Sequence, residues 1–191
     1  MASLVGFVRK GTRILFTRLR EQGVTVTSKW VYSRGYTKLT GLPTLSFSRV
    51  TPQLYVGAQH NARGKALLER HGIHYAINMR DEYDDAANGI ALQNYCYLPT
   101  IDDTAPSLEH LQKGVQFIHE AIRGEGKVYI HCAGGIGRAP TMAVAYLIST
   151  GLSLEEAIAL IKRARPFINI MPPQLEVLRD FERMIHETQR S

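Results

Sequence analysis

The sequence predicts one α/β domain with a mainly parallel central sheet flanked by helices, preceded by a basic N-terminal helical extension. A chain of 191 residues is long enough for one compact domain with a sizeable core, and short for two. From residue 45 onward, short apolar runs alternate with stretches of helical periodicity. Strands separated by helices form largely parallel sheets that helices cover on both faces.

The extension is expected over residues 1–44 and the folded domain over residues 45–191. Residues 3–19 carry apolar side chains at helical spacing, with arginines toward another face, and predict a helix. Residues 21–44 are polar and contain three glycines and one proline. This composition predicts a linker or a segment that wraps around the domain.

The domain has four predicted strands and five predicted helices. The strands are the apolar runs at 54–58, 73–79, 94–99 and 127–131. Helical periodicity covers residues 61–71, 107–123, 139–150, 154–164 and 172–187. In a sheet of this kind, ligands bind just beyond the carboxyl ends of the strands, where a loop leads into a helix.

The positive charge of the chain is concentrated in the extension. The net charge is +6, but residues 1–40 hold eight Lys or Arg and one Glu, whereas residues 41–191 hold 15 basic and 16 acidic residues. The nearly neutral domain argues against a nucleic-acid groove across its body, and no nucleic-acid partner is expected. The basic, acid-free residues 3–20 suit a helix at an anionic membrane surface. The alternatives are a helix packed on the domain and a targeting segment.

The chain has two cysteines, Cys96 and Cys132. This number excludes a disulfide framework and most structural zinc sites, and we expect neither a metal nor a cofactor. A free thiol with a chemical role suits a reducing intracellular compartment. No run approaches the roughly 20 apolar residues that span a bilayer, and the N-terminus does not have the charge order of a secretory signal.

The most informative segment follows the strand predicted at 127–131. It reads HCAGGIGR, with the residues His131, Cys132, Ala133, Gly134, Gly135, Ile136, Gly137 and Arg138. Glycines let successive N–H groups turn inward around an anion, and the helix that begins near Arg138 adds its partial positive charge. Arg138 can hold two phosphate oxygens in a planar fork. The same dipoles would stabilise a thiolate on Cys132, which would then act as a nucleophile and form a phosphocysteine intermediate.

This segment resembles the His-Cys-x5-Arg signature of the protein tyrosine and dual-specificity phosphatase superfamily, and the resemblance extends over roughly residues 45–187. The segments INMRDEYDD, LQKGVQFIHEA and RPFINIMPPQLEVLRDFERMI are most similar to the mitochondrial-type phosphatidylglycerophosphate phosphatase. The loop itself, with GIGRAP, is also similar to that of plant glucan phosphatases. The resemblance implies a dual-specificity phosphatase fold and hydrolysis of phosphate monoesters, in a peripheral-membrane or organellar, mitochondrial setting.

A phosphocysteine mechanism needs an acid that protonates the leaving oxygen and later activates water. The family takes this acid from an Asp about 30 residues before the cysteine, and Asp102 matches it within TIDDTAP. Asp103 is the close alternative. Asp103 or Thr104 could also simply cap the helix that begins near Pro106.

The resemblance also suggests roles for other residues. His131 would order the loop through backbone hydrogen bonding, and Gln174 either positions the hydrolytic water or is a polar residue in the first turn of the last helix. Arg80 and Tyr83 either line the substrate entrance or belong to a solvated loop. Ala139 is a departure, because the family usually places Ser or Thr there to help release the thiolate.

The sequence therefore predicts a cysteine-dependent phosphate monoester hydrolase that acts through Cys132, Arg138, Asp102 and His131, with phosphate bound by residues 133–138. The favoured substrate is an anionic phospholipid headgroup such as phosphatidylglycerophosphate or a phosphoinositide. The alternatives are a phosphotyrosine or phosphoserine protein, a phosphoglucan, and a pseudophosphatase that binds phosphate without turnover.

Overall fold

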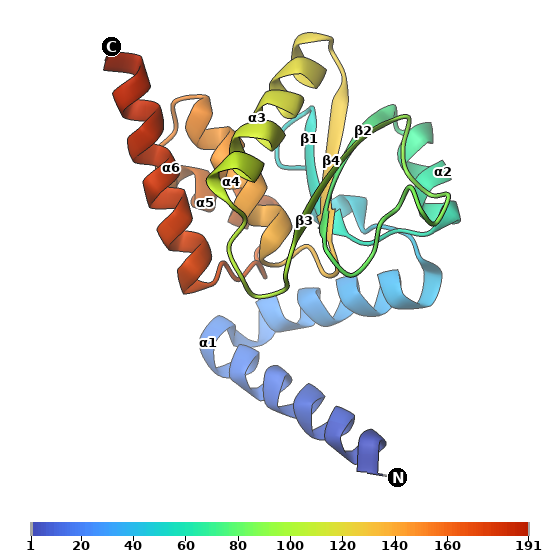
Figure 1. Cartoon of the computed structure of the whole chain (residues 1–191). Coiled ribbons are helices and arrows are strands. Elements are labelled where there is room, and N and C mark those ends of the chain that lie inside the picture. Colours follow the sequence, from blue (N-terminus) through green and yellow to red (C-terminus); the bar gives the residue numbers. More distant parts are fainter. Residues whose placement is uncertain (1, 191) are drawn as a thin grey trace.

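The computed structural model describes the backbone of residues 2–190 and the side chains of residues 12–187. Its centre is a four-stranded parallel sheet in the order β1-β4-β2-β3 (Figure 1). The strands are β1 (Leu54–Ala58), β2 (Ile73–Arg80), β3 (Asn94–Thr100) and β4 (Lys127–Cys132). The predicted parallel sheet is confirmed, and each strand lies within one residue of its predicted bounds. The two inner strands, β4 and β2, are paired on both edges, which explains their nearly continuous apolar sequences.

Helices cover both faces of the sheet, but unequally. The larger core lies on the face covered by α3 (Leu108–Arg123), α4 (Arg138–Ser149), α5 (Leu154–Ala164) and α6 (Pro172–Arg190). The smaller core lies beside α2 (Ala62–Arg70) and includes Leu68, Ile73 and Tyr129. Helix α4 is buried along nearly its whole length, because it packs on the sheet and on three other helices. It is therefore a rigid support for the loop that precedes it.

The extension is helical almost throughout, so of the two alternatives for residues 21–44 the linker is wrong, and the segment lies against the domain as a helix. Helix α1 runs from Ala2 to Thr40 and is broken at Gly23, whose φ of 76° and ψ of 171° are not helical. A short 3₁₀ helix, η1 (Leu45–Phe47), follows. In Figure 1 the first half of α1 projects from the domain, and the second half runs along the edge at which β4 ends.

The second half of α1 has its polarity reversed, and this is why the sequence pattern did not reveal it. Thr27 and Ser33 are buried against the domain, and the Ser33 and Thr44 hydroxyls lie 2.6 Å apart. In contrast, Val24 and Leu39 are 74% and 88% exposed. A helix that buries hydroxyls and exposes aliphatic side chains does not show the usual amphipathic pattern. Within the described part of the chain, no helix is long and apolar enough to cross a membrane.

Candidate active site

The loop Cys132–Arg138, called here the phosphate loop, joins the end of β4 to the start of α4. The backbone N–H of Gly135 donates to Cys132 Sγ over 3.2 Å, so the chain curls around the sulfur. Gly135 has a φ of 63°, and a Cβ there would lie 2.4 Å from the backbone of Gly57. Only glycine fits this position. The first N–H groups of α4 and its dipole are directed at the same place, which favours an anion beside Cys132.

The phosphate loop is held from behind by Arg165, which the sequence analysis missed. This guanidinium is buried and donates to the carbonyl oxygens of Gly135 and Gly134 over 2.6 and 2.9 Å, and to Phe47 O over 3.0 Å. It also stacks on the ring of Phe167, 4.6 Å from its centroid. Because Arg165 draws these carbonyl groups outward, the peptide N–H groups of the loop are left to face the anion site.

Arg138 is oriented by acidic residues on the loop after β2. Its two terminal nitrogens donate to the carboxylate of Glu82 over 2.8 and 3.0 Å, and Nη1 also donates to Thr100 O over 2.8 Å. This bidentate pairing lowers the pKa of Glu82 well below its ordinary value. Arg138 Nε is buried and meets no partner among the described residues, so it keeps a donor for a phosphate oxygen.

Asp102 and Asp103 both line the cavity that contains Cys132, but they differ in their contacts. Asp102 Oδ1 lies 3.0 Å from Arg138 Nη2, although its side chain is 70% exposed. Asp103 has a φ of 61° and makes the turn. Neither Asp103 nor Thr104 caps α3, because that position belongs to Ser107, whose hydroxyl accepts from His110 N–H. The capping alternative is therefore wrong.

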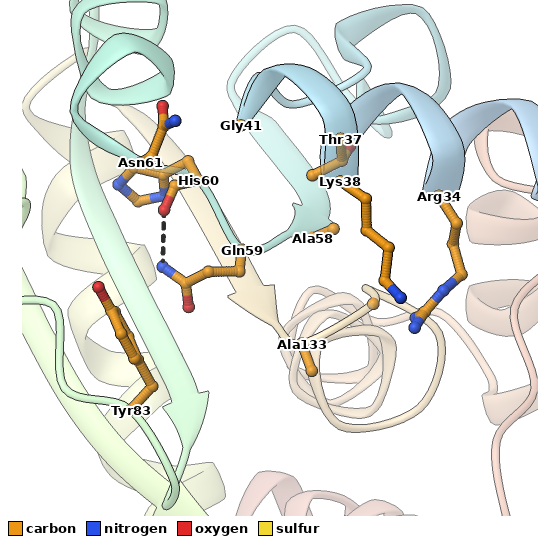
Figure 2. A pocket seen from close by; sticks show the side chains of 11 residues that line it. Arg34, Thr37, Lys38, Gly41, Ala58, Gln59, His60, Asn61, Tyr83 and Ala133 are labelled. Atoms are coloured by element: carbon orange, nitrogen blue, oxygen red, sulfur yellow. Dashed lines mark hydrogen bonds between the residues drawn. The ribbon is translucent and has the colours of Figure 1, made fainter. Parts of the chain in front are cut away.

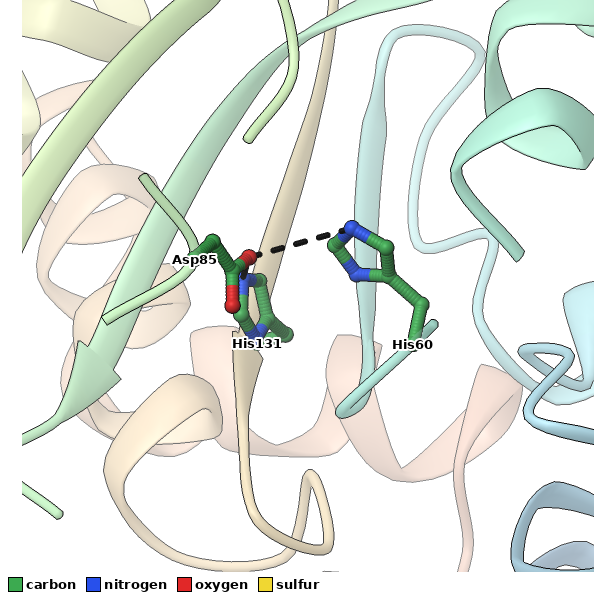
Figure 3. Close-up of side chains that lie close together, drawn as sticks. All are labelled: His60, Asp85 and His131. Atoms are coloured by element: carbon green, nitrogen blue, oxygen red, sulfur yellow. Dashed lines mark ion pairs between the residues drawn. The ribbon is translucent and has the colours of Figure 1, made fainter. Parts of the chain in front are cut away.

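His131 belongs to a buried cluster with His60 and Asp85 (Figure 3). Asp85 Oδ2 lies 2.9 Å from His131 Nε2 and 3.7 Å from His60 Nε2. Neither ring nitrogen of His131 makes a hydrogen bond among the described residues, so the expected bond from its ring to the loop backbone is not formed. Instead the ring stacks on Tyr129 and packs against His60. His131 is fixed by a carboxylate and by aromatic packing.

The cluster also brings potential metal ligands together. One ligand atom from each of the three residues lies within 4.8 Å of the others. One oxygen of the carboxylate is committed, because Asp85 Oδ1 accepts from Gln59 Nε2 over 2.8 Å, whereas Oδ2 faces His131 Nε2 at 2.9 Å without a well-aligned hydrogen bond. Burial, followed by the neighbouring His131, lowers the pKa of His60 to about 4. We interpret the group as a polar support for β4.

Comparisons with known proteins agree with this geometry. Residues 54–184 match the dual specificity phosphatase catalytic domain. The chain belongs to the dual specificity phosphatase family.

The relatives are of two kinds. The human and mouse proteins named phosphatidylglycerophosphatase and protein-tyrosine phosphatase 1 are 34% and 35% identical, over 73% and 82% of this chain and 74% and 78% of theirs. Mouse dual specificity protein phosphatase 8 is 30% identical over 75% of this chain, which spans only 22% of that relative. Among solved structures, PTPMT1 in complex with PI(5)P has a TM-score of 0.67 and 30% identity, over 74% of this chain and 97% of that one.

In this dual specificity phosphatase, Gln174 lines the same cavity as Cys132. Its side-chain amide is engaged at both ends, since Nε2 donates to Thr104 O over 2.9 Å and Oε1 accepts from Met171 N–H over 3.0 Å. These bonds tie the loop that carries Asp102 to the start of α6. The structure therefore gives Gln174 a positioning contact, and its suggested role toward water stays a prediction.

Arg80 and Tyr83 are placed differently from each other. Arg80 donates to Glu82 and Gln59 over 2.8 and 3.0 Å, and its guanidinium lies over the ring of Tyr83. Tyr83 lines a second cavity beside the phosphate loop. Arg80 does not line this cavity, and its guanidinium instead packs on the Tyr83 ring. Of the two residues suggested for a substrate entrance, only Tyr83 lines either of the two cavities beside the phosphate loop.

The extension supplies part of the cavity that contains Cys132, called here the catalytic cavity, and the sequence did not indicate this contribution. This cavity has a volume of about 250 Å³, and Arg18, Trp30 and Arg34 of α1 line it together with Cys132. Arg18 donates to Phe167 O over 3.1 Å and lies over the Trp30 ring, 4.7 Å from its centroid. Both halves of α1 therefore reach the mouth of the site.

The remaining two residues singled out by sequence are buried. Cys96 packs in the larger core, where burial raises the pKa of its thiol. Ala139 follows Arg138 and is fully buried at the start of α4. The nearby Thr141 hydroxyl donates to Gly137 O over 2.9 Å, so it is committed to the helix.

Proposed function

We propose that the protein is a cysteine-dependent phosphatase that hydrolyses phosphate monoesters through Cys132, Arg138 and Asp102. The observation that carries this proposal is that Cys132 and Asp102 line one cavity while Asp102 pairs with Arg138, the last residue of the phosphate loop. The phosphate loop curls around Cys132 Sγ, Arg138 Nε has no hydrogen-bond partner among the described residues, and Asp102 Oδ1 lies 3.0 Å from Arg138 Nη2.

The arrangement supports a two-step reaction. Phosphate bound by the N–H groups of residues 133–138 and by Arg138 presents its phosphorus to Cys132 Sγ, and sulfur replaces the leaving oxygen. Asp102 gives its proton to that oxygen. In the second step water, deprotonated by the Asp102 carboxylate, attacks the phosphorus and releases the thiolate and inorganic phosphate.

We further propose an anionic phospholipid headgroup as the substrate. Three relatives of the chain are named phosphatidylglycerophosphatase and protein-tyrosine phosphatase 1, and one similar structure is a complex with PI(5)P. The extension supports a membrane partner, because Phe16, Val24 and Leu39 of α1 are each more than 70% exposed. Basic residues accompany them, and exposed apolar side chains beside Lys and Arg suit an anionic membrane surface.

The proposal is tested with the wild type and Cys132→Ser against para-nitrophenyl phosphate and a matched panel of lipid, peptide and glucan phosphates. Cys132→Ser should abolish turnover because serine is not ionised at neutral pH, whereas the matched control Cys96→Ser should retain it. Turnover by Cys132→Ser would refute the mechanism, and no turnover by the folded wild type would favour the pseudophosphatase. A preference for peptide or glucan phosphates would refute the lipid proposal alone.

A further inference from the structure

A second cavity adjoins the catalytic one, between the end of α1 and the loop that joins β1 to α2. Its volume is about 370 Å³. Figure 2 shows Arg34 and Lys38 reaching from α1 toward the phosphate loop, with Tyr83 on the other side of the cavity. No step of the proposed reaction uses this space.

The two cavities share one wall. Arg34, Ala133 and Gly134 line both of them. The Arg34 guanidinium lies directly on the loop, since a Cβ on Gly134 would come within 2.4 Å of its Nη1. A ligand whose reacting phosphate sits at Cys132 can therefore pass Ala133 and continue into the second cavity without leaving the protein surface.

The lining of the second cavity is suited to an anion. Arg34 and Lys38 are basic, and no Asp or Glu is among the residues that line it. No ion pair joins Arg34 to a carboxylate among residues 12–187, and the neighbouring charges of Arg18 and Arg165 are positive. An uncompensated guanidinium among like charges is unfavourable until an anion binds.

A neutral donor points to the same conclusion. Thr37 lines the cavity, and its hydroxyl is buried without a hydrogen-bond partner among the described residues. Buried hydroxyls are nearly always paired in folded proteins, so one left unpaired beside a cavity indicates a missing ligand or water. Arg34 and Thr37 lie three residues apart in a helix and therefore share a face.

We propose that this cavity is a second phosphate subsite, formed by Arg34, Lys38 and Thr37. The inference rests on the proposed phosphatase function and narrows its substrate class. The preferred substrates would carry a phosphate monoester for Cys132 and a second phosphate group a short spacer away. A lipid headgroup with two phosphates and a free bisphosphate share this chemistry, and the experiment separates them.

The test compares propyl phosphate with trimethylene bisphosphate, which adds a phosphate at the far carbon. The lipid arm compares short-chain phosphatidic acid with short-chain phosphatidylglycerophosphate, both as monomers. The wild type should favour the doubly phosphorylated member of each pair. Arg34→Gln or Lys38→Gln should reduce that ratio of kcat/KM by about tenfold, the loss of one charge-assisted contact. Lys29→Gln, which removes an exposed charge from the same helix, should leave the ratio unchanged.

Two results would overturn the subsite. They are equal kcat/KM for the two members of both pairs in an active wild type, and an equal effect of Arg34→Gln on both members. A preference seen only in the lipid pair would identify the headgroup as the source of the second phosphate, and one seen in both pairs would identify the bisphosphate chemistry itself.

Calorimetry on Cys132→Ser separates failure of the subsite from failure of the phosphatase proposal, because it requires no turnover. In that background, Arg34→Gln should weaken binding of trimethylene bisphosphate by about tenfold, and binding of propyl phosphate much less. Equal weakening of both ligands would overturn the subsite, whether or not the wild type hydrolyses any phosphate. Thermal midpoints of the variants check that α1 stays packed on the domain.

Discussion

At the scale of single residues, the contacts of Asp102 and Asp103 separate two carboxylates that the sequence left as alternatives. The Asp102 carboxylate pairs with Arg138, whereas Asp103 adopts a left-handed backbone conformation that reverses the chain. Asp tolerates this conformation better than most residues. Asp103 therefore has a structural role in the turn that is independent of catalysis, and Asp102 contacts Arg138, the arginine proposed to bind phosphate.

The general acid matters most when the leaving group is poor. Asp102→Asn should therefore slow hydrolysis of an alkyl phosphate by about a hundredfold or more, and of para-nitrophenyl phosphate much less. Asp103→Asn, which can keep the left-handed turn, should have a milder effect on both. Steady-state kinetics with the two substrates measure these ratios, and the reverse order would assign the acid to Asp103.

Arg165 could not be identified as a functional residue from the sequence, because nothing in the run KRARP distinguishes it from its basic neighbours. The fold makes the difference, since Arg165 is buried behind the phosphate loop while Arg163 is exposed. By contrast, the short spacing of His131, Cys132 and Arg138 is local, so the sequence alone indicated their place between a strand and a helix.

Arg165→Lys keeps the charge but loses the fork that holds two loop carbonyls and Phe47 O. We expect the free energy of unfolding to fall by about 3 kcal/mol, as for two lost hydrogen bonds from a charged group. The kcat/KM should fall as well, because the loop is less well ordered. Arg163→Lys, in the last turn of α5, is the control. Urea unfolding and steady-state kinetics measure the two effects. Equal unfolding free energies and equal kcat/KM for the two variants would contradict the role of Arg165.

At the scale of elements, the strands and helices of the domain were predictable because their apolar periodicity matches their burial. The extension was not, for two reasons. The second half of α1 buries hydroxyls instead of aliphatic side chains, and its contact with the catalytic cavity joins residues that are far apart in the sequence. Neither the buried hydroxyls nor this long-range contact can be recognised from a local sequence pattern.

The break in α1 depends on Gly23, whose φ and ψ are accessible essentially to glycine alone. Gly23→Ala should destabilise the bent arrangement by about 1–3 kcal/mol and loosen the contact of Arg18 with Phe167 O. Gly35→Ala is the matched control, because a Cβ there meets nothing within 4 Å and the residue is helical. It should be neutral or stabilising.

Hydrogen exchange over residues 12–22 measures this difference. We expect faster exchange in Gly23→Ala than in the wild type, and no increase in Gly35→Ala. Unchanged exchange in Gly23→Ala would show that the bend does not hold the first half of α1 at the site.

At the scale of the whole molecule, stability should depend on pH through the buried cluster behind β4. The folded-state pKa of His60 is about 4 against an ordinary value of 6.5, because of burial and then the charge of His131. Between these values the unfolded chain binds a proton that the folded chain does not, so acidification destabilises the fold. Burial raises the pKa of Asp85, but pairing with His131 outweighs burial and lowers it. The stability that Asp85 contributes is therefore lost only at a pH below the range in which His60 acts.

We expect the free energy of unfolding to fall by about 2 kcal/mol between pH 7 and pH 5 on account of His60. The groups that face this ring are His131, Asp85, Lys65 and the carbonyl of Ile90. His60→Gln should lose this part of the pH dependence, while His110→Gln on α3 should keep it. Urea unfolding at the two pH values measures this difference. If the free energy of unfolding of His60→Gln fell between pH 7 and pH 5 as much as that of the wild type, the assignment to His60 would be wrong.

The uneven distribution of charge and of exposed apolar side chains leads to the last prediction, which concerns the membrane. Phe16 and Val24 of α1 are 72% and 74% exposed, and neither lines the catalytic cavity or the second one. The double variant Phe16→Ser, Val24→Ser should therefore bind anionic vesicles more weakly than the wild type at every salt concentration. Leu108→Ser, which removes an exposed leucine from α3, should bind as the wild type does.

Salt separates the two contributions to vesicle binding. Each basic residue near the surface is worth about 1 kcal/mol, and this attraction fades as the Debye length shortens. Apolar insertion is far less sensitive to salt, so the double variant should lose most of the binding that survives at high salt in the wild type. Co-sedimentation at low and high salt measures both contributions. Equal, negligible binding by all three proteins would end the membrane proposal, and the phospholipid substrate would then rest on the relatives alone.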